Sequence, residues 1–424
     1  MARNGNSKGM KETKFKDTEL GKIPEEWDYG KFEDYLDKFS AGATPYRGIA
    51  SNFIGTIPWV SSGELNYNYI TDTREHISQD AQKSTHLTLH PKGTFLIAIT
   101  GLEAAGTRGR CAFIETPATT NQSCLAIYST EKMIVEYLFW FYQQWSDYLA
   151  FNFSQGSKQQ SFTAEIVKKL PIYAPSLSEQ QRIASALSDA DALVTELDVL
   201  IEKKRAIMAG TMQELLTGKR RLQGFDEPWV ERILGQIGTF VAGNGFPLIH
   251  QGKSKGKYPF YKVSDMNNSG NQTYMIVANN HIDQEVANIL NCNIIPANSI
   301  VFAKIGAAIF LERKRLTSID CCIDNNMQSF QCNKSFDCQY ALWLLRSIKI
   351  ADSVSQTALP ALKVTDLKKI EVYIPSSLAE QRAIASILSD MDAEIAELEA
   401  KRDKYKEVRQ GMMQQLLTGK IRLI

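Results

Sequence analysis

Two stretches of the chain place apolar residues at steps of four and three, which is the period of a coiled-coil helix. The first series consists of Ile183, Leu187, Ala190, Val194, Leu197 and Ile201. The second consists of Ile384, Leu388, Met391, Ile395 and Leu398. Each series forms an apolar stripe that needs a partner, so the two matching stripes predict two long helices that pack together in antiparallel orientation. A surface helix docked on its own domain is the alternative.

Both stretches carry signals for the start and the end of a helix. Ser176–Glu179 and Ser377–Glu380 fit the capping box, in which a serine oxygen and a glutamate carboxylate accept from free amides of the first turn. Gly218 and Gly419 stand where a helix needs a left-handed C-terminal residue. Each predicted helix therefore holds about 38 residues and is about 57 Å long.

The chain is a tandem duplication. Residues 177–222 align with residues 378–423 without a gap, and about half of the aligned positions are identical. The likeness extends outside the helices, because residues 39–45 (FSAGATP) match residues 240–247 (FVAGNGFP). The period of about 200 residues is too long for a solenoid. Each copy is therefore predicted to be a domain followed by a helix.

Between the helices the pattern changes to short β-rich runs bounded by Gly, Pro and Asn, such as residues 93–101 and 298–306. These runs alternate with short helical patterns, which predicts a mixed α+β class for both globular parts. The predicted division is a flexible tail over 1–16, a first domain over 17–175, a first helix over 176–218, a second domain over 219–375 and a second helix over 376–424.

Composition narrows the possible classes. No run of eighteen apolar residues occurs, and the N-terminal residues lack the apolar middle of a signal peptide, so a cytoplasmic location without membrane contact is expected. The seven cysteines include no CxxC pair, which favours reduced thiols over a zinc site. The formal net charge is only +1, so any binding of nucleic acid must use local basic patches.

Motifs for catalysis are missing from the sequence. GLEAAGTR at residues 101–108 has the glycine spacing of a phosphate loop but lacks the required Lys-Ser/Thr. The glycine-rich turn at residues 240–246 has no second glycine in its counterpart at residues 39–45. The five histidines show no metal-binding spacing, and no GxSxG elbow occurs. The chain is therefore predicted to catalyse nothing by itself and to need no metal or cofactor.

Cations and amides on loops between the predicted strands favour DNA binding. Cations suit phosphate contacts, whereas Asn, Gln and Arg can read base edges. The candidate cations are Arg108, Arg110, Lys158, Lys257, Lys262, Lys304, Arg313, Lys314 and Arg315. The candidate amides are Asn121, Gln122, Gln159, Asn325, Asn326 and Gln328. For any one of them a solvated turn or a polar device of the fold is the alternative.

The order of motifs resembles a known family. A Pro-Glu-Glu-Trp segment, a globular region, a LSEQQRIA or LAEQRAIA helix and LLTGK occur in this order and are then repeated, with DEPW in place of the first segment. This order is similar to that of the DNA specificity subunit of type I restriction-modification enzymes, over nearly the whole chain. The resemblance implies two target recognition domains, joined by two antiparallel coiled-coil helices in a circular layout with a pseudo-twofold axis.

The resemblance also implies the function and the partners. Each domain would read one half of a split site in double-stranded DNA, and the paired helices would set the distance between the half-sites. The helices would bind two modification subunits, which carry the methyl-donor site, and the complex would recruit restriction subunits that translocate and cleave DNA. Three alternatives remain open: a specificity chain of a fused modification and cleavage system, a coiled-coil scaffold without DNA, and a self-contained methyltransferase.

Overall fold

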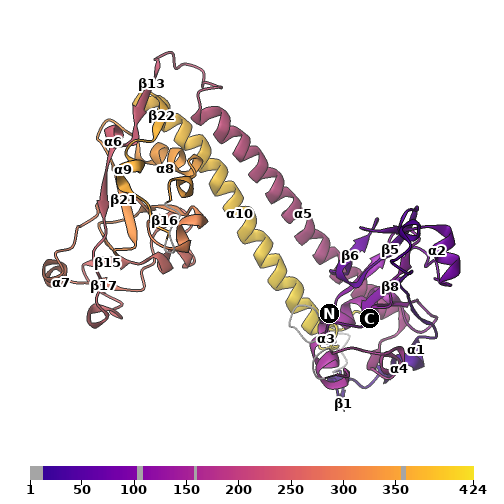
Figure 1. The fold of residues 1–424 in the computed structure, drawn as a ribbon. Helices are drawn as coiled ribbons and strands as arrows, with labels where there is room; N and C mark the ends of the chain where they lie inside the picture. The colour runs from indigo at the N-terminus through magenta and orange to yellow at the C-terminus, as the bar shows by residue number, and fades with distance from the viewer. Residues whose placement is uncertain (1–12, 103–107, 157–159, 355–359) are drawn as a thin grey trace, which may run out of the picture. The chain divides into compact units, whose positions relative to one another are not determined.

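The structure is a computed structural model that describes residues 13–102, 108–156, 160–354 and 360–424. The two predicted long helices are α5 (Leu177–Leu216, 40 residues) and α10 (Leu378–Leu416, 39 residues), shown in Figure 1. Gly218 and Gly419 follow them with φ of +70° and +65°, the left-handed conformation expected at a helix end. Within the described ranges no helix combines the length and apolar character needed to cross a bilayer.

Internal contacts group the chain into two units. The first unit comprises residues up to Leu197 together with Lys401–Ile424, and the second comprises Asp198–Ala400. Each unit thus contains a globular part, the beginning of one long helix and the end of the other. Both globular parts mix helices with sheets, which confirms the predicted class.

The first unit is built on a five-stranded sheet of order β4-β11-β8-β9-β6 and a three-stranded sheet of order β10-β5-β7. Its strands are β1 (Phe15–Thr18), β2 (Gly21–Pro24), β3 (Asp28–Lys31), β4 (Phe39–Ala41), β5 (Ile57–Val60), β6 (Asn68–Ile70), β7 (His76–Ile77), β8 (Phe95–Ala98), β9 (Cys111–Ile114), β10 (Thr119–Thr120), β11 (Cys124–Ile127) and β12 (Pro171–Ala174). Its shorter helices are α1 (Phe32–Tyr35), η1 (Ala50–Phe53), η2 (Ser62–Glu64), α2 (Gln79–Ser84), α3 (Val135–Phe153) and α4 (Ala164–Lys168).

The second unit repeats this topology, with sheets of order β14-β21-β18-β19-β16 and β17-β15-β20. Its strands are β13 (Trp229–Ile233), β14 (Gly238–Ala242), β15 (Tyr258–Tyr261), β16 (Tyr274–Met275), β17 (His281–Ile282), β18 (Ile300–Ala303), β19 (Lys314–Thr317), β20 (Cys322–Ile323), β21 (Met327–Cys332) and β22 (Glu371–Pro375). Its shorter helices are α6 (Leu234–Ile237), η3 (Leu248–His250), η4 (Val263–Asn267), α7 (Gln284–Ile289), η5 (Ala307–Leu311), α8 (Cys338–Ser347), η6 (Ile350–Ser353) and α9 (Val364–Leu367).

The strand pairing of the five-stranded and three-stranded sheets recurs in both units, whereas the β1-β2 pair is found only in the first among the described residues. β5 pairs with β10 in parallel and with β7 in antiparallel orientation, as β15 pairs with β20 and β17. β18 and β19 form an antiparallel pair in the second unit and flank η5. The duplication inferred from the helices therefore extends to the fold of the globular parts.

Both long helices contribute to the hydrophobic core of each unit. In the first unit Ile183 and Leu187 of α5 share a core with Met413 and Leu416 of α10. In the second unit Ile384 and Leu388 of α10 share a core with Met208 and Leu215 of α5. The stripe residues Ile183, Leu187, Val194, Ile201, Ile384, Leu388 and Ile395 are buried, and Leu197, Met391 and Leu398 are half-buried.

Ion pairs accompany this packing within each unit. Asp191 of α5 pairs with Arg409 of α10 in the first unit. Lys204 of α5 pairs with Glu394 of α10 at 2.6 Å in the second. Apolar contacts with charged pairs at their flanks are typical of helices that pack along a seam.

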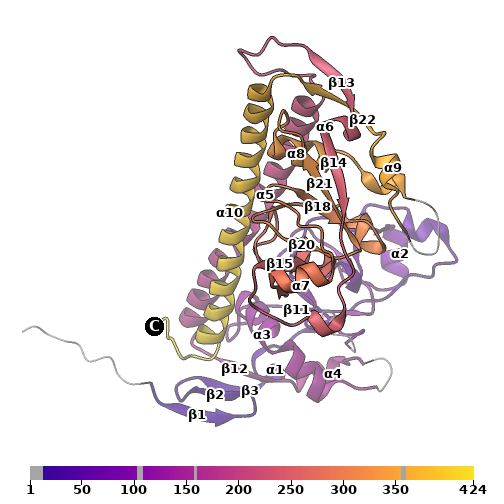
Figure 2. The same cartoon turned by 90° about the vertical axis from the view of Figure 1, so that its left-hand side faces the viewer.

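Each globular part is attached to the start of its helix by the same pair of contacts. Trp140 of α3 donates to Ser188 of α5 at 3.3 Å, and Trp343 of α8 donates to Ser389 of α10 at 3.1 Å. The amide oxygen of Gln180 accepts from the backbone of Ile134, as that of Gln381 accepts from Asp337. Figure 2 shows α8 beside the beginning of α10.

A buried glutamate lies at the start of each long helix. The predicted capping box has Ser176 accepting from the amide of Glu179 at 3.3 Å, but the Glu179 carboxylate has other partners. It accepts from the indole of Trp27 at 3.1 Å and from Arg422 at 2.6 and 2.8 Å. Arg422 also pairs with Glu26 at 3.2 Å, so the C-terminal residues lie against the beginning of the first domain.

The second unit repeats this cluster with residues from different parts of the chain. Glu380 accepts from Trp229 at 3.2 Å and from Arg221 at 3.1 and 2.7 Å. The glutamate part of the capping-box prediction is therefore wrong for both helices, because each carboxylate joins a helix start to a tryptophan and an arginine.

Candidate nucleic-acid interface

In each unit a glycine lets the loop after β4 or β14 pass close to the turn before β11 or β21. A Cβ on Gly42 would lie 2.0 Å from the carbonyl oxygen of Thr120, and one on Gly243 would lie 1.9 Å from that of Asp324. Neither position leaves room for a side chain. Loop and turn therefore form one continuous edge. We call residues 42–54 with 119–123 the first loop edge, and residues 243–257 with 324–326 the second loop edge.

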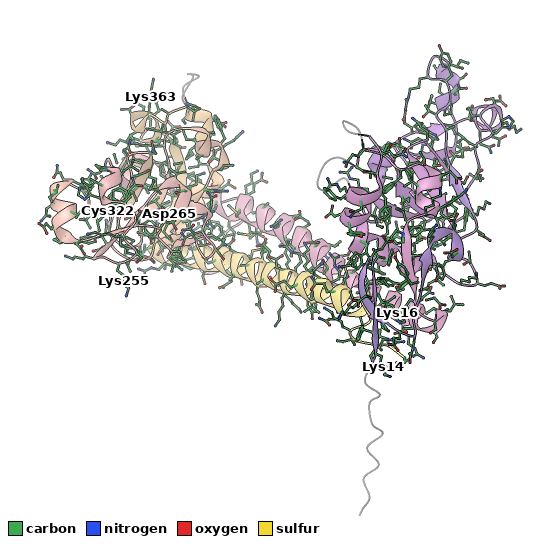
Figure 3. All side chains as sticks on the ribbon, turned by 90° about the horizontal axis from the view of Figure 1, so that it is seen from below. Lys14, Lys16, Lys255, Asp265, Cys322 and Lys363 are labelled. Atoms are coloured by element: carbon green, nitrogen blue, oxygen red, sulfur yellow. The ribbon has the colours of Figure 1, made fainter. Side chains whose placement is uncertain are left out.

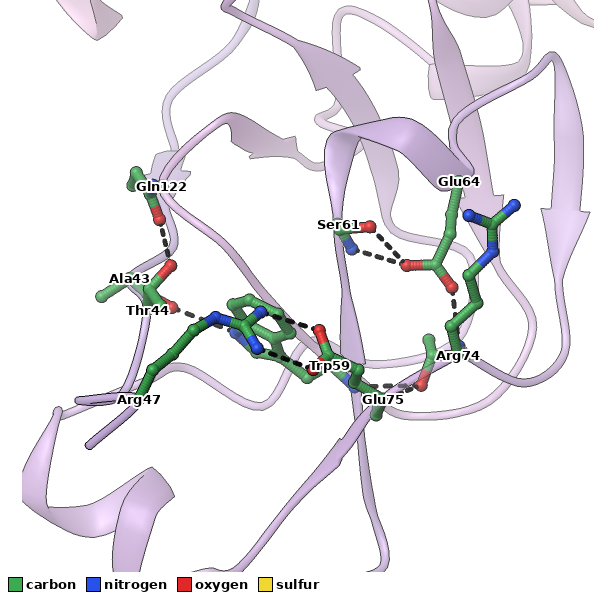
Figure 4. Close-up of polar contacts among 10 residues, drawn as sticks. Ala43, Thr44, Arg47, Trp59, Ser61, Glu64, Arg74, Glu75 and Gln122 are labelled. Atoms are coloured by element: carbon green, nitrogen blue, oxygen red, sulfur yellow. Dashed lines mark hydrogen bonds and ion pairs between the residues drawn. The ribbon is translucent and has the colours of Figure 1, made fainter. Parts of the chain in front are cut away.

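The first loop edge is held by an arginine (Figure 4). Arg47 donates to both carboxylate oxygens of Glu75 at 2.8 Å, and its guanidinium lies over the rings of Phe53 and Trp59. The indole of Trp59 donates to the carbonyl of Ala43 at 3.0 Å. The hydrogen bonds from Arg47 lower the pKa of the Glu75 carboxyl, which keeps the pair ionised at neutral pH.

The turns of both loop edges are closed by a side-chain oxygen. Asn121 accepts from the backbone of Ser123 at 3.0 Å, and Asp324 accepts from that of Asn326 at 3.1 Å. Such bonds define Asx turns. Asn121 therefore stabilises its turn, and the side-chain amide of Asn326 also donates to Asp324 at 3.4 Å. These bonds favour, for both asparagines, the alternative of a structural role in the fold.

Two other amides lie at the tips of these turns and are exposed. They are Gln122 in the first unit and Asn325 in the second. The Gln122 amide oxygen accepts from the hydroxyl of Thr44 across the first loop edge (Figure 4). The sequence predicted both residues as base-reading candidates, and the structure places them at equivalent positions.

Arg108 and Arg110 precede β9 and are half-buried. Arg108 donates to the carbonyl of Leu102 at 2.8 Å and lies 3.6 Å from Asp147. Arg110 lines an open polar groove together with Gly63, Glu64, Asn66, Asn68, Ile70, Asp72, Thr73 and Arg74. The residues that line this groove include hydrogen-bond donors, hydrogen-bond acceptors, and both positively and negatively charged side chains.

Three candidate lysines of the second unit lie on or beside the second loop edge. Lys257 is exposed and donates to Gln284 at 2.6 Å. Lys262 is half-buried and donates to Gln251 at 3.1 Å. The backbone amide of Lys304 donates to the carbonyl of Asn326 at 2.8 Å, which places this half-buried lysine next to the turn.

Two predicted DNA-binding residues are buried, so their assignment is wrong for this structure. Lys314 is 1% exposed and donates to the carbonyl of Ile348 at 2.8 Å as well as to Glu312. Burial lowers the pKa of Lys314. Gln328 is fully buried in β21. Neither side chain can reach a phosphate or a base, because strands and helices cover both.

Two arginines flank Lys314: Arg315 stabilises the fold, and Arg313 lies near the surface. Arg315 donates to the carbonyls of Asn271 at 2.7 Å and Lys314 at 3.0 Å, and burial lowers its pKa to about 10. Arg313 is half-buried and donates to Asn267. Lys158 and Gln159 lie outside the described residues.

Sequence reasoning missed several residues of these edges. It passed over Arg47, and over the large side chains that directly follow Pro45 and Pro247, namely Tyr46, Leu248 and Ile249. The sequence could have indicated these residues, because they occupy equivalent positions in the two copies of the repeat. Among the described residues, no three His, Cys, Asp or Glu side chains converge as a metal-ligand set.

In the comparisons with known proteins, one family matches both copies of the repeat. The family described as type I restriction modification DNA specificity domain matches residues 24–203 and again residues 226–407. The specificity subunit of the type I restriction enzyme MjaIX of Methanocaldococcus jannaschii is 26% identical over an alignment of 432 positions, which covers 97% of each chain. A second specificity subunit from that organism, the putative MjaX subunit, is 24% identical and covers 97% of this chain and 98% of its own.

Solved structures share the fold. The crystal structure of the type I restriction-modification S subunit from M. genitalium aligns with a TM-score of 0.60 at 16% identity, covering 92% of this chain and 96% of that one. A chain from a structure of complex assembly in the type I restriction-modification system aligns with a TM-score of 0.55 at 16% identity, covering 94% and 99%. With a family match in each half and relatives that align from end to end, this chain belongs to the type I restriction-modification DNA specificity family.

Proposed function

We propose that this chain is the DNA-reading subunit of a type I restriction-modification complex and that it catalyses no reaction itself. Each globular domain reads one half of a bipartite, asymmetric site in double-stranded DNA. The observation that carries this proposal is the match of both halves to a DNA specificity domain. It is supported by relatives named as specificity subunits that align over nearly the whole chain.

The loop edges support one half-site for each domain. Both edges are built by the same strands and the same glycine, but their outward residues differ. Gln122 stands at the tip where the second unit has Asn325, and Arg47 is replaced in the second unit by an apolar residue. A shared scaffold with different surface residues suits two readers of different sequences. The residues we retain as DNA contacts are Arg108, Arg110, Gln122, Lys257, Lys262, Lys304, Arg313 and Asn325.

The long helices are proposed as the spacer between the two readers. We assign the recognition domains to residues 17–175 and 219–375, and the spacer helices to residues 176–218 and 376–424. In each unit the end of one helix shares a core with the start of the other. This pattern supports an antiparallel coiled coil along the full length of α5 and α10, about 60 Å for 40 residues.

The duplicated helices are also proposed as the docking surfaces for two modification subunits. The two helices repeat their sequence over 46 aligned positions from Leu177 and Leu378, so each offers one copy of the partner nearly the same surface. The modification subunits supply the methyl-donor site, and restriction subunits join through the complex.

Genome-wide methylation mapping tests the proposal. Co-expressed with its modification subunit, the chain is expected to form a complex with two modification subunits by native mass spectrometry and to direct methylation to one bipartite motif. Exchange of residues 219–375 for those of a relative should change one half of the motif and leave the other half unchanged. Methylation without a bipartite motif, or a change in both halves, would contradict the assignment of one half-site to each domain.

A further inference from the structure

The second loop edge exposes two adjacent apolar side chains at the tip of a turn. Leu248 and Ile249 of η3 are 83% and 85% exposed, and among the other described large apolar side chains only the C-terminal Ile424, at 84%, reaches this range. Single exposed apolar residues are common on soluble proteins. An adjacent pair on an ordered turn is less common and suggests a surface that is covered in a complex.

The turn that carries this pair is held on both sides. Phe246, two residues before Leu248, stacks on the buried Phe260 with 3.7 Å between ring centroids and 10° between ring planes. After the turn, Gln251 donates to the carbonyl of Phe246 at 2.7 Å and accepts from Lys262 at 3.1 Å. Leu248 and Ile249 are therefore presented by a pre-organised loop, which lowers the entropy cost of inserting them into a partner.

The charges next to the pair favour an anionic partner. Lys253, Lys255 and Lys257 follow within eight residues of Ile249 and are all exposed. Lys255 points outward at the edge of its unit (Figure 3). Lys253 has a long ion pair of 3.5 Å with Asp283, and Lys257 contacts the neutral Gln284. An apolar tip beside a lysine series fits duplex DNA, where lysines contact phosphates and apolar side chains enter between base pairs.

The first loop edge presents a large side chain at the same place. Tyr46 directly follows Pro45, as Leu248 follows Pro247, and it is 74% exposed. Its carbonyl accepts from Asn52 at 3.0 Å, so this loop is also ordered. Both copies have thus kept an exposed, bulky residue at this position although its identity differs. A side chain that served only the core would be buried in both.

We propose that Leu248 and Ile249 form a wedge that enters the minor groove of the DNA beside the half-site of the second domain and unstacks one base step. Lys253, Lys255 and Lys257 hold the flanking phosphates. The inference rests on the proposed function and adds a contact of indirect readout, in which the cost of deforming a base step depends on its sequence.

The test uses the complex with its modification subunit and a duplex that contains the mapped site with 2-aminopurine at successive positions. Wild-type complex should raise the fluorescence at one step beside the second half-site. The variant with Leu248→Ala and Ile249→Ala should lose this signal and bind about tenfold more weakly for each side chain. Its salt dependence of binding should be unchanged, because no phosphate contact is removed.

Two further variants separate the contributions. Ile319→Ala, at a residue that is 55% exposed after β19, should leave affinity and fluorescence unchanged. Lys253, Lys255 and Lys257 are replaced by Ala in the second variant. The slope of its log affinity against log salt concentration should fall by the equivalent of up to about three phosphate contacts. All variants should keep the wild-type melting temperature, since exposed side chains contribute little to stability.

Each outcome has a separate meaning. If the wild-type complex methylates its bipartite site and the Leu248 and Ile249 variant binds equally well, the wedge is refuted and the proposed function stands. If that variant fails to retain the modification subunit in a pull-down, the pair contacts protein and the wedge is again refuted. If the wild-type complex recognises no DNA site, the proposed function itself fails.

Discussion

At the scale of single residues, burial decides which charged side chains can act on DNA. Lys314 and Lys257 are both lysines of the second unit, and both looked equally suited to bind phosphate in the sequence. Lys314 lies in β19 with its amine bonded to Ile348, whereas Lys257 precedes β15 on an exposed loop. The residue type is the same, so the difference arises from the position of each side chain relative to the sheet.

A buried histidine predicts a pH dependence of the first unit. The Nδ1 atom of His90 lies 2.5 Å from the Tyr128 hydroxyl, and burial, with a smaller contribution from Lys38, lowers the pKa of His90 to about 4. The pKa of an unfolded histidine is about 6.5. Between these values the unfolded chain binds more protons, so the stability contributed by neutral His90 is complete above pH 6.5 and is lost as the pH falls to 4.

Urea unfolding of the first unit should therefore show a loss of about 2 kcal/mol between pH 6.5 and 5 that depends on His90. His90→Asn should remove this part of the pH dependence. His86→Asn, at an exposed position, should retain it. Equal slopes in wild type and His90→Asn would show that other groups cause the pH dependence.

At the scale of elements, each long helix is fixed to its domain by a cluster of side chains that occurs once in each unit. Each cluster joins the first turn of a helix to a tryptophan before it and to an arginine after the LLTGK segment of the other helix. The carboxylates of Glu179 and Glu380 are almost fully buried, so each depends on its arginine for a compensating charge. The arginine that the IRL and RRL sequences share after LLTGK is thereby explained.

Removal of one arginine tests the cluster of the first unit. Arg422→Ala would leave the buried Glu179 carboxylate with Trp27 as its remaining partner in the cluster and should lower the free energy of unfolding of this unit by about 2 kcal/mol. Tryptophan fluorescence during urea unfolding measures the change. Lys420→Ala, at an exposed position two residues earlier, is the control and should differ little from wild type. An unchanged midpoint for Arg422→Ala would mean that the cluster adds no stability.

At the scale of the whole molecule, the duplication supports the proposal that a single chain recognises a DNA site in two halves. In the proposed function, two copies of one domain provide two readers, and the repeated helix surfaces are assigned as two docking sites. The family matches in residues 24–203 and 226–407 each include a globular part and most of the following helix. The repeated family unit is thus a globular part together with most of the helix that follows it.

Lengthening the spacer tests its proposed role as a ruler. Insertion of one heptad into both helices, after Leu197 and after Leu398, adds about 10 Å and should lengthen the gap between half-sites by about three base pairs. The bases within each half-site should stay the same in methylation mapping. Insertion into one helix alone should disrupt the pairing of the seams and lower stability. Altered half-sites with an unchanged gap would refute the proposal that the helices set the distance between the half-sites.

The sequence alone determined the repeated elements of this protein, because they depend on local periodicity. Heptad steps and helix-end glycines predicted α5 and α10, and the gapless repeat predicted the duplicated domains. The order of the motifs indicated the family by resemblance. The details of the site depend on contacts between distant residues. Arg422 meets Glu179 across 243 positions, and the Gly42 loop meets Thr120 at the end of β10. Only the tertiary structure decided that Lys314 and Gln328 are buried while Leu248 and Ile249 are exposed, because burial depends on which strands and helices cover a side chain.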